Sequence, residues 1–191
     1  MTPDLILQIF FLFLFCFILA ALESQIEGEA GWAQNLPTWR PKDNWYTHFY
    51  RKVMSGKDMT GYHLFVFSLV LVFMHYPYFT GRVWSWSAEL ATFSLFFLIA
   101  IVWDFLWFVI NPRYDFGHFW AEQVWWHKNW FLHLPIDYWI GFLVSMLLYI
   151  RFSLNWFLLK EWLQIVALLF ILTLAVVIFA NAVGIFRVKQ K

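Results

Sequence analysis

Five side chains of this sequence are candidate metal ligands of the types that bind ions without the help of cysteine. They are two glutamates four residues apart, an aspartate inside an apolar stretch and two histidines, namely Glu23, Glu27, His63, Asp104 and His127. Carboxylate oxygens and imidazole nitrogens together suit iron, manganese or zinc, and ligands from several helices can converge inside a bundle. We therefore predict a transition-metal site formed by these five residues, in which Asp104 and His127 are also the catalytic groups.

No established metal-binding motif supports this prediction. The sequence contains no Glu-x-x-His pair, no His-rich boxes and no His-Glu-x-x-His motif. Its single cysteine, Cys16, lies in an apolar run, which excludes an intrachain disulfide and a cysteine metal cluster. The prediction of a metal site therefore depends on whether the helices bring the five residues to one place.

Asp104 carries the strongest functional signal of the five. It lies in the stretch IAIVWDFLWFVINP, seven residues before Asn111 and Pro112 end the helix, which places it about 10 Å from the helix end. Ionisable groups at such positions are costly and usually functional. The alternative is a single buried ion pair or a hydrogen bond to a tryptophan. For Glu23 and Glu27 the alternative is a solvated helix end, although acids there oppose the helix dipole and require a compensating cation.

The composition predicts an integral membrane protein. Of 191 residues, 62% are hydrophobic, 24% are aromatic and 13% are charged, against roughly 25% charged residues in soluble domains. The net charge of +1 argues against a nucleic-acid partner. Five segments approach the length of about 20 apolar residues that crosses a bilayer, so we predict an all-α single membrane domain over residues 1–191. Its predicted spans are 5–22, 61–79, 88–110, 136–153 and 162–183.

The flanking cations predict how these spans are oriented, because cytoplasmic flanks carry an excess of lysine and arginine. One side collects ten cations against three on the other. The ten are Arg40, Lys42, Arg51, Lys52, Lys57, Arg113, Lys128, Arg187, Lys189 and Lys191, and the three are Arg82, Arg151 and Lys160. This predicts a multi-pass protein of the cell (inner) membrane, with its N-terminus outside, its C-terminus in the cytoplasm and all five candidate ligands at the cytoplasmic face.

Two polar segments are predicted to lie along this cytoplasmic face. Residues 113–134 show a helical period with an apolar face that includes His127, which predicts an amphipathic interfacial helix. Residues 31–41 contain Pro37 and Pro41, so we expect a loop that folds back with Trp32 and Trp39 in the headgroup layer.

Other polar residues are expected to have structural roles. His75 and Glu89 fall at the outer ends of their spans, where they are expected to form a separate pair. Asp137 is expected to be a first-turn acid favoured by the helix dipole. Most of the 14 tryptophans fit interfacial belts. Alternatively, some of them wall a pocket for a quinone, a carotenoid or an acyl chain.

Three functions follow from these observations. The leading hypothesis is a metal-dependent membrane enzyme, for example an oxidoreductase, that acts on a lipid or another apolar substrate at the cytoplasmic face. The second is a non-catalytic subunit, or a lipid-binding or quinone-binding component, of a larger membrane complex. The third is a proton or ion translocating protein that uses Asp104, His63 and Glu89.

Overall fold

The computed structural model describes residues 1–184, and most of them are helical. Three of the cations that predicted the orientation, Arg187, Lys189 and Lys191, lie outside the described residues. The elements are α1 (Pro3–Glu27), α2 (Trp45–Val53), α3 (Gly61–Phe79), α4 (Trp86–Ile110), α5 (Gly117–Trp120), β1 (Trp130–Phe131), β2 (Leu134–Pro135), α6 (Ile136–Tyr149) and α7 (Trp156–Val183).

Four helices are long and apolar enough to cross a membrane, namely α1, α3, α4 and α7. This agrees with the expected class of all-α membrane protein. The remaining predicted span, 136–153, corresponds to α6, which has only 14 residues. At 1.5 Å per residue α6 is about 21 Å long, shorter than the roughly 30 Å of a bilayer's hydrocarbon core.

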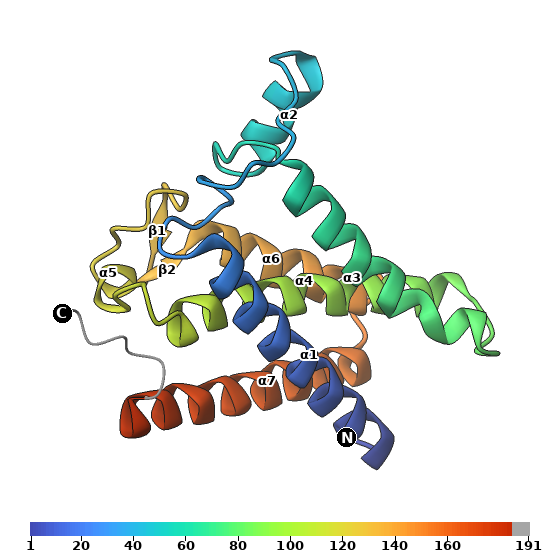
Figure 1. Cartoon of the computed structure of the whole chain (residues 1–191). Helices are drawn as coiled ribbons and strands as arrows, with labels where there is room; N and C mark the ends of the chain where they lie inside the picture. The colour runs from blue at the N-terminus through green and yellow to red at the C-terminus, as the bar shows by residue number, and fades with distance from the viewer. Residues whose placement is uncertain (185–191) are drawn as a thin grey trace.

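Helix α4 lies at the centre of the bundle, with α1 and α6 packed against it (Figure 1). Its buried side chains include Leu98, Ile99 and Leu106, each at most 1% exposed. Small residues on α6 allow the two helices to approach closely. A Cβ atom added to Gly141 would lie 2.8 Å from Ile101 Cδ1 on α4, and Ser145 Oγ lies 2.9 Å from Ser94 Oγ.

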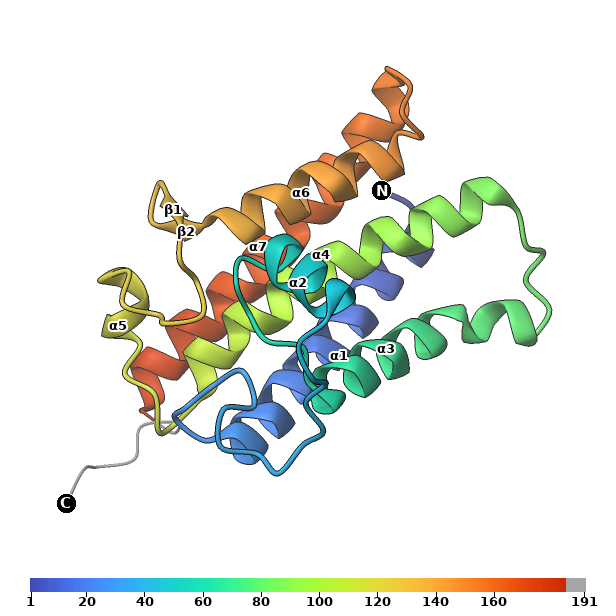
Figure 2. The ribbon, with the colours of Figure 1, turned by 90° about the horizontal axis from the view of Figure 1, so that it is seen from above.

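The helix directions gather most polar segments at one end of the bundle. Asn111, after α4, donates a hydrogen bond of 2.7 Å to the carbonyl of Gly28, after α1. The N-terminal ends of α3 and α6 lie at the same end (Figure 2). We call this the polar end, which comprises these helix ends and the segments 28–60 and 111–135. The opposite end holds the short connections 80–85 and 151–155 and the N-terminus.

The predicted interfacial helix over 113–134 is wrong as a continuous element. The segment contains only the one-turn helix α5 and the small hairpin β1–β2. Asp115 accepts a hydrogen bond from the backbone of Gly117 and starts α5. Glu122, Leu132 and His133 have φ values of 58°, 50° and 60°, and a right-handed helix cannot continue through this left-handed conformation.

Helix α2 was not predicted from the sequence, although it is amphipathic. Asn44 caps its first turn by accepting hydrogen bonds from the backbones of Tyr46 and Thr47. Trp45, Phe49 and Val53 share one face and are 79%, 64% and 59% exposed. This helix therefore presents an apolar face at the polar end of the molecule.

Candidate metal site

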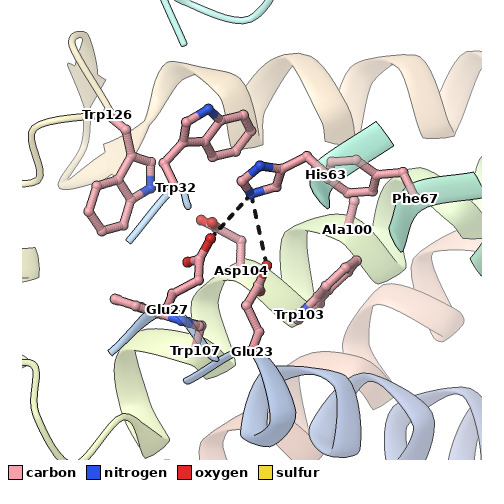
Figure 3. A pocket seen from close by; sticks show the side chains of 10 residues that line it. All are labelled: Glu23, Glu27, Trp32, His63, Phe67, Ala100, Trp103, Asp104, Trp107 and Trp126. Atoms are coloured by element: carbon pink, nitrogen blue, oxygen red, sulfur yellow. Dashed lines mark ion pairs between the residues drawn. The ribbon is translucent and has the colours of Figure 1, made fainter. Parts of the chain in front are cut away.

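The two glutamates of the last turn of α1 face the imidazole of the first turn of α3. Helix α1 runs past the predicted boundary at residue 22 and ends at Gly28, whose φ is 67°. Glu23 and Glu27 are therefore one turn apart and both are 8% exposed. His63 Nε2 lies 3.5 Å from Glu27 Oε1 and 3.9 Å from Glu23 Oε1 (Figure 3). One ligand atom from each of these three side chains lies within 4.8 Å of the others. Within residues 1–184, this is the only group of three or more His, Cys, Asp or Glu side chains that is close enough to hold one metal ion.

Thr60 and Trp32 hold the imidazole of His63 in this orientation. Thr60 caps α3, and its Oγ1 lies 2.8 Å from His63 Nδ1. Trp32 stacks on the imidazole at 4.0 Å between ring centroids. A hydrogen bond to the second ring nitrogen is how metal-ligating histidines are commonly oriented. Nε2 is thereby left to face the two carboxylates.

The spacing of the three ligand atoms fits a metal ion better than it fits direct hydrogen bonds. Nitrogen and oxygen ligands lie about 2.1 Å from zinc, so two ligands of a tetrahedral ion are about 3.4 Å apart. The observed distances from Nε2 to the carboxylates, 3.5 and 3.9 Å, exceed a good hydrogen bond. Small side-chain movements would therefore complete a coordination sphere around a cation placed between these atoms.

The loop after α1 closes over the site. The backbone N–H of Ala33 donates to Glu27 Oε1 at 2.5 Å, and Arg40 donates to the Ala33 carbonyl at 2.6 Å. Trp32 and Ala33 have φ values of 45° and 50°, and such a conformation costs non-glycine residues about 1–3 kcal/mol each. The surrounding contacts must offset this cost. Trp32, which was predicted to lie in the headgroup layer, is 8% exposed and packs on His63, whereas Trp39 is 56% exposed.

Asp104 and His127 contact each other in a second cluster beside the first. His127 Nε2 lies 3.0 Å from Asp104 Oδ2, and the Tyr138 hydroxyl donates to the same oxygen at 2.5 Å. His127 Nδ1 lies 3.3 Å from Asp137 Oδ2. Because each ring nitrogen of His127 faces a carboxylate, the geometry favours the imidazolium form, in which both nitrogens donate.

The charge balance of this second cluster supports a protonated His127. Burial alone lowers the pKa of His127, but the charge of Asp104 and hydrogen bonds to Asp104 and Asp137 raise the pKa above its ordinary value of 6.5. Lys57 Nζ lies 2.5 Å from Asp137 Oδ2, and Ser55 donates a hydrogen bond to Asp137. Two carboxylates therefore face two cations. The structure thus places His127 among ion-pair partners and not with Glu23, Glu27 and His63.

Asp104 connects the two clusters because it also lines a pocket with the three converging ligands. The pocket has a volume of about 30 Å³. Its walls are Glu23, Glu27, Trp32, His63, Phe67, Ala100, Trp103, Asp104, Trp107 and Trp126 (Figure 3). One water molecule needs about 10–15 Å³, so the pocket holds an ion or one to two water molecules. It does not hold a quinone or an acyl chain in this conformation.

Sequence reasoning missed the roles of Lys57, Asp137 and Tyr138. Lys57 was counted only as an orienting cation, and Asp137 was assigned to the helix dipole. The available signal was the position of Asp137 and Tyr138 in the first turn of α6, at the same end of the bundle as Asp104. The partner of Asp104 is His127, so the ion pair that was the alternative reading of Asp104 is present.

The predicted pair at the opposite end is present. His75 Nε2 lies 2.9 Å from Glu89 Oε1. His75 belongs to α3 and Glu89 to the first turn of α4, across the connection 80–85. This pair is built from the same residue types as the candidate site.

Comparisons of the chain with protein-family models, with curated proteins and with solved structures find no match. The function proposed below rests on the residues and their geometry.

Proposed function

We propose that the protein is a membrane metalloenzyme that binds one transition-metal ion through Glu23, Glu27 and His63. The observation that carries this proposal is the convergence of these three buried ligand atoms within 4.8 Å of one another. Iron, manganese and zinc all accept this set of carboxylate and imidazole ligands. The substrate is a lipid or another apolar molecule that reaches the site from the membrane.

Asp104 is the proposed catalytic group beside the metal. A metal ion in such a site supplies a Lewis acid or a water of lowered pKa. Asp104 lines the same pocket and is hydrogen-bonded to His127 and Tyr138 on one oxygen. These contacts fix the carboxylate at the pocket wall, where it exchanges a proton with the reacting group. His127 supports Asp104 and holds the proton that balances its charge.

Access of a large substrate requires movement of the loop over the site. The pocket volume of about 30 Å³ admits only the reacting end of a lipid. Trp32 covers His63, and the strained backbone at Trp32 and Ala33 belongs to this covering loop. We propose that this loop is the element that opens, since strained segments of this kind concentrate at ligand clamps and switch regions.

The proposed orientation places the polar end, and with it the metal site, in the cytoplasm. Of the ten cations within residues 1–184, seven belong to the polar end and three to the opposite end, which supports this orientation through the positive-inside rule. Helix α6 is proposed as a fifth crossing because it runs between the two ends of the bundle. Helix α2, with Trp45 and Phe49 exposed, is proposed as the interfacial helix.

Elemental analysis of the detergent-purified protein tests the metal site. We expect about one transition-metal ion per chain in the wild-type protein. Glu27→Gln and His63→Ala should each reduce the metal content at least tenfold, whereas Glu89→Gln, a matched change in the opposite pair, should leave it unchanged. Absence of metal from the wild-type protein, or equal metal content in all four proteins, would refute the proposal.

A non-catalytic role within a larger membrane complex is the second candidate. Two helices with largely exposed surfaces favour this role. In the most apolar stretch of 18 residues, only 11% of the residues of α3 and 22% of those of α7 are buried within the protein. Purification in a mild detergent separates the two ideas. A stable monomer that binds metal supports the enzyme, whereas a metal-free protein that always purifies with other membrane subunits supports the complex.

Proton or ion translocation is the third proposal, and it has the least support. Asp104 and Glu89 lie on the same helix, but between them the buried polar residues of α4 are only Thr92 and Ser94. A polar path across the bundle would have to pass this apolar stretch. A flux assay in liposomes, with Asp104→Asn as the comparison, tests it directly.

A further inference from the structure

Two tryptophans in the wall of the pocket carry buried hydrogen-bond donors without acceptors. Trp103 and Trp107 lie one turn apart on α4 and are 3% and 2% exposed. Within residues 1–184, neither indole N–H has a hydrogen-bond partner. Trp103 lies close enough to Glu23 to influence its carboxylate, but its N–H does not reach hydrogen-bonding geometry. Both rings line the pocket that contains the candidate metal ligands (Figure 3).

Several other indoles of the described residues donate hydrogen bonds, in contrast to these two. Trp32 donates to the Asp58 carbonyl at 2.9 Å, Trp130 to the His127 carbonyl at 2.9 Å and Trp162 to Ser145 Oγ at 2.9 Å. An unsatisfied buried donor destabilises the folded protein, and native proteins contain few of them. Two such donors in one small pocket therefore indicate that something else in the pocket accepts their hydrogen bonds.

We propose that the pocket binds, next to the metal ion, a small ligand that accepts hydrogen bonds from the indole N–H groups of Trp103 and Trp107. This inference rests on the proposed metal site and specifies the reacting group that the site takes. An indole N–H can only donate, so the ligand must present lone pairs. The chemical class is a metal-bound oxygen ligand, either water or hydroxide, or a small oxygen-containing anion or group of the substrate.

Size and charge restrict the ligand further. The volume of about 30 Å³ admits the metal ion and about one further non-hydrogen atom. The carboxylates of Glu23 and Glu27 repel a free anion, so the metal ion must neutralise them before a negatively charged ligand binds. The charge of Asp104 is balanced by His127. The two indoles then act as donors to the charge that collects on the bound oxygen, as in other sites that stabilise an oxyanion.

Fluoride binding to the Co²⁺-loaded protein tests the inference. Fluoride is a single-atom metal ligand with lone pairs that accept hydrogen bonds, and its binding changes the visible absorption of Co²⁺. We expect Trp103→Phe and Trp107→Phe, which keep an aromatic ring and remove the N–H, to weaken fluoride binding about fivefold to tenfold each. Trp162→Phe, which removes an indole N–H outside the pocket, should bind fluoride as the wild-type protein does.

The outcomes separate this inference from the metal site itself. A wild-type protein that binds no Co²⁺ overturns the proposed function and this inference together. If the protein binds Co²⁺ but the fluoride affinities of the wild type, Trp103→Phe and Trp107→Phe are equal, the inference alone is overturned. If Trp103→Phe lowers only the affinity for Co²⁺, its N–H serves the Glu23 carboxylate and the inference fails for that residue.

A measurement on the unmodified chain guards against variants that fold poorly. In the Zn²⁺-loaded wild-type protein labelled with ¹⁵N, each of the 14 tryptophans gives one indole signal. We expect fluoride to shift two indole signals strongly and to leave that of Trp162 in place. Uniformly small shifts of all indole signals would contradict a ligand held by Trp103 and Trp107.

Discussion

Each end of the bundle holds a histidine of α3 against a glutamate, and the two sites differ in how completely their polar atoms are paired. At the opposite end, His75 uses both ring nitrogens, at 2.9 Å to Glu89 and 2.6 Å to the Leu71 carbonyl. The second oxygen of Glu89 accepts from the Trp84 indole at 2.9 Å. At the polar end, His63 faces two carboxylates at 3.5 and 3.9 Å, beyond good hydrogen bonds.

This difference shows which of two similar pairs has capacity left for a ligand. The pair of His75 and Glu89 satisfies itself and is best explained as structure. The group of Glu23, Glu27 and His63 concentrates buried acceptors around one point and leaves two indole donors unpaired nearby. The proposed metal ion would make this arrangement favourable, because buried charges are costly unless they are paired or coordinate a metal.

The largest predicted effect concerns the cluster of Lys57, Asp137, His127 and Asp104, which we call the saturated cluster because its charges are paired. Lys57→Met removes a cation that is 5% exposed and leaves Asp104 and Asp137 to share His127. Removing one partner of a buried ion pair costs about 3–5 kcal/mol, and we expect a loss near the lower figure, since Asp137 is partly exposed. Thermal unfolding in detergent, followed by tryptophan fluorescence, measures it.

The control for this change is Lys52→Met, because Lys52 is exposed on α2. Substitutions at such positions usually alter stability by less than about 0.5 kcal/mol. Equal melting temperatures for Lys57→Met and Lys52→Met would mean that the cluster of Lys57, Asp137, His127 and Asp104 does not hold the polar end together.

The second predicted effect compares the stability of two glutamate variants, one at each end of the bundle, and the two changes should have opposite signs. In metal-free protein, Glu23→Gln should increase stability by about 1–2 kcal/mol, because it removes one of several converging carboxylates; functional sites often sacrifice stability in this way. Glu89→Gln should instead decrease stability by about 1 kcal/mol, because it weakens a completed hydrogen-bonded pair. Denaturation in the presence of EDTA measures both. Loss of stability in both variants would show that the polar end is as satisfied as the opposite end.

The sequence predicted the site best where the position of a span determines the position of a side chain. Glu23, Glu27 and His63 lie next to span boundaries, so their common end of the membrane followed from hydropathy and the alternation of helix directions. The position of Asp104 near the same end followed from its distance of seven residues to the end of its span. Contacts within the pocket could not be predicted, because they depend on side-chain directions at helix ends that hydropathy does not determine.

Prediction failed where the backbone leaves regular structure. The period of residues 113–134 matched a helix, but left-handed residues and a hairpin replace it. His127 was still predicted to be buried, and it is 4% exposed, although its position depends on a loop and not on a helical face. Trp32 was expected to face the headgroups, because the loop contacts that turn it onto His63 have no sequence signature.

The smallest predicted effect is a pH dependence of stability to which His127 contributes through its contacts with Asp104 and Asp137. The charge of Asp104 and the hydrogen bonds to both aspartates raise the pKa of His127 above 6.5 against the opposing effect of burial. A group whose pKa is raised by folding binds its proton more tightly in the folded state, so its contribution is complete below pH 6.5 and is lost as the pH rises through the folded pKa. The unfolding free energy of metal-free protein should therefore fall above pH 6.5.

His127→Gln tests this dependence, because a glutamine side chain keeps hydrogen-bonding groups but does not titrate. We expect the variant to be less stable than the wild type at pH 6 and to show a smaller decrease in stability above pH 6.5. His118→Gln, a change in the same segment outside this cluster, should keep the wild-type pH profile. If His127→Gln also keeps it, His127 is neutral between its two aspartates and the cluster carries an uncompensated negative charge. The charge of Asp104 would then not be balanced by His127, and the saturated cluster would differ less from the pocket of Glu23, Glu27 and His63.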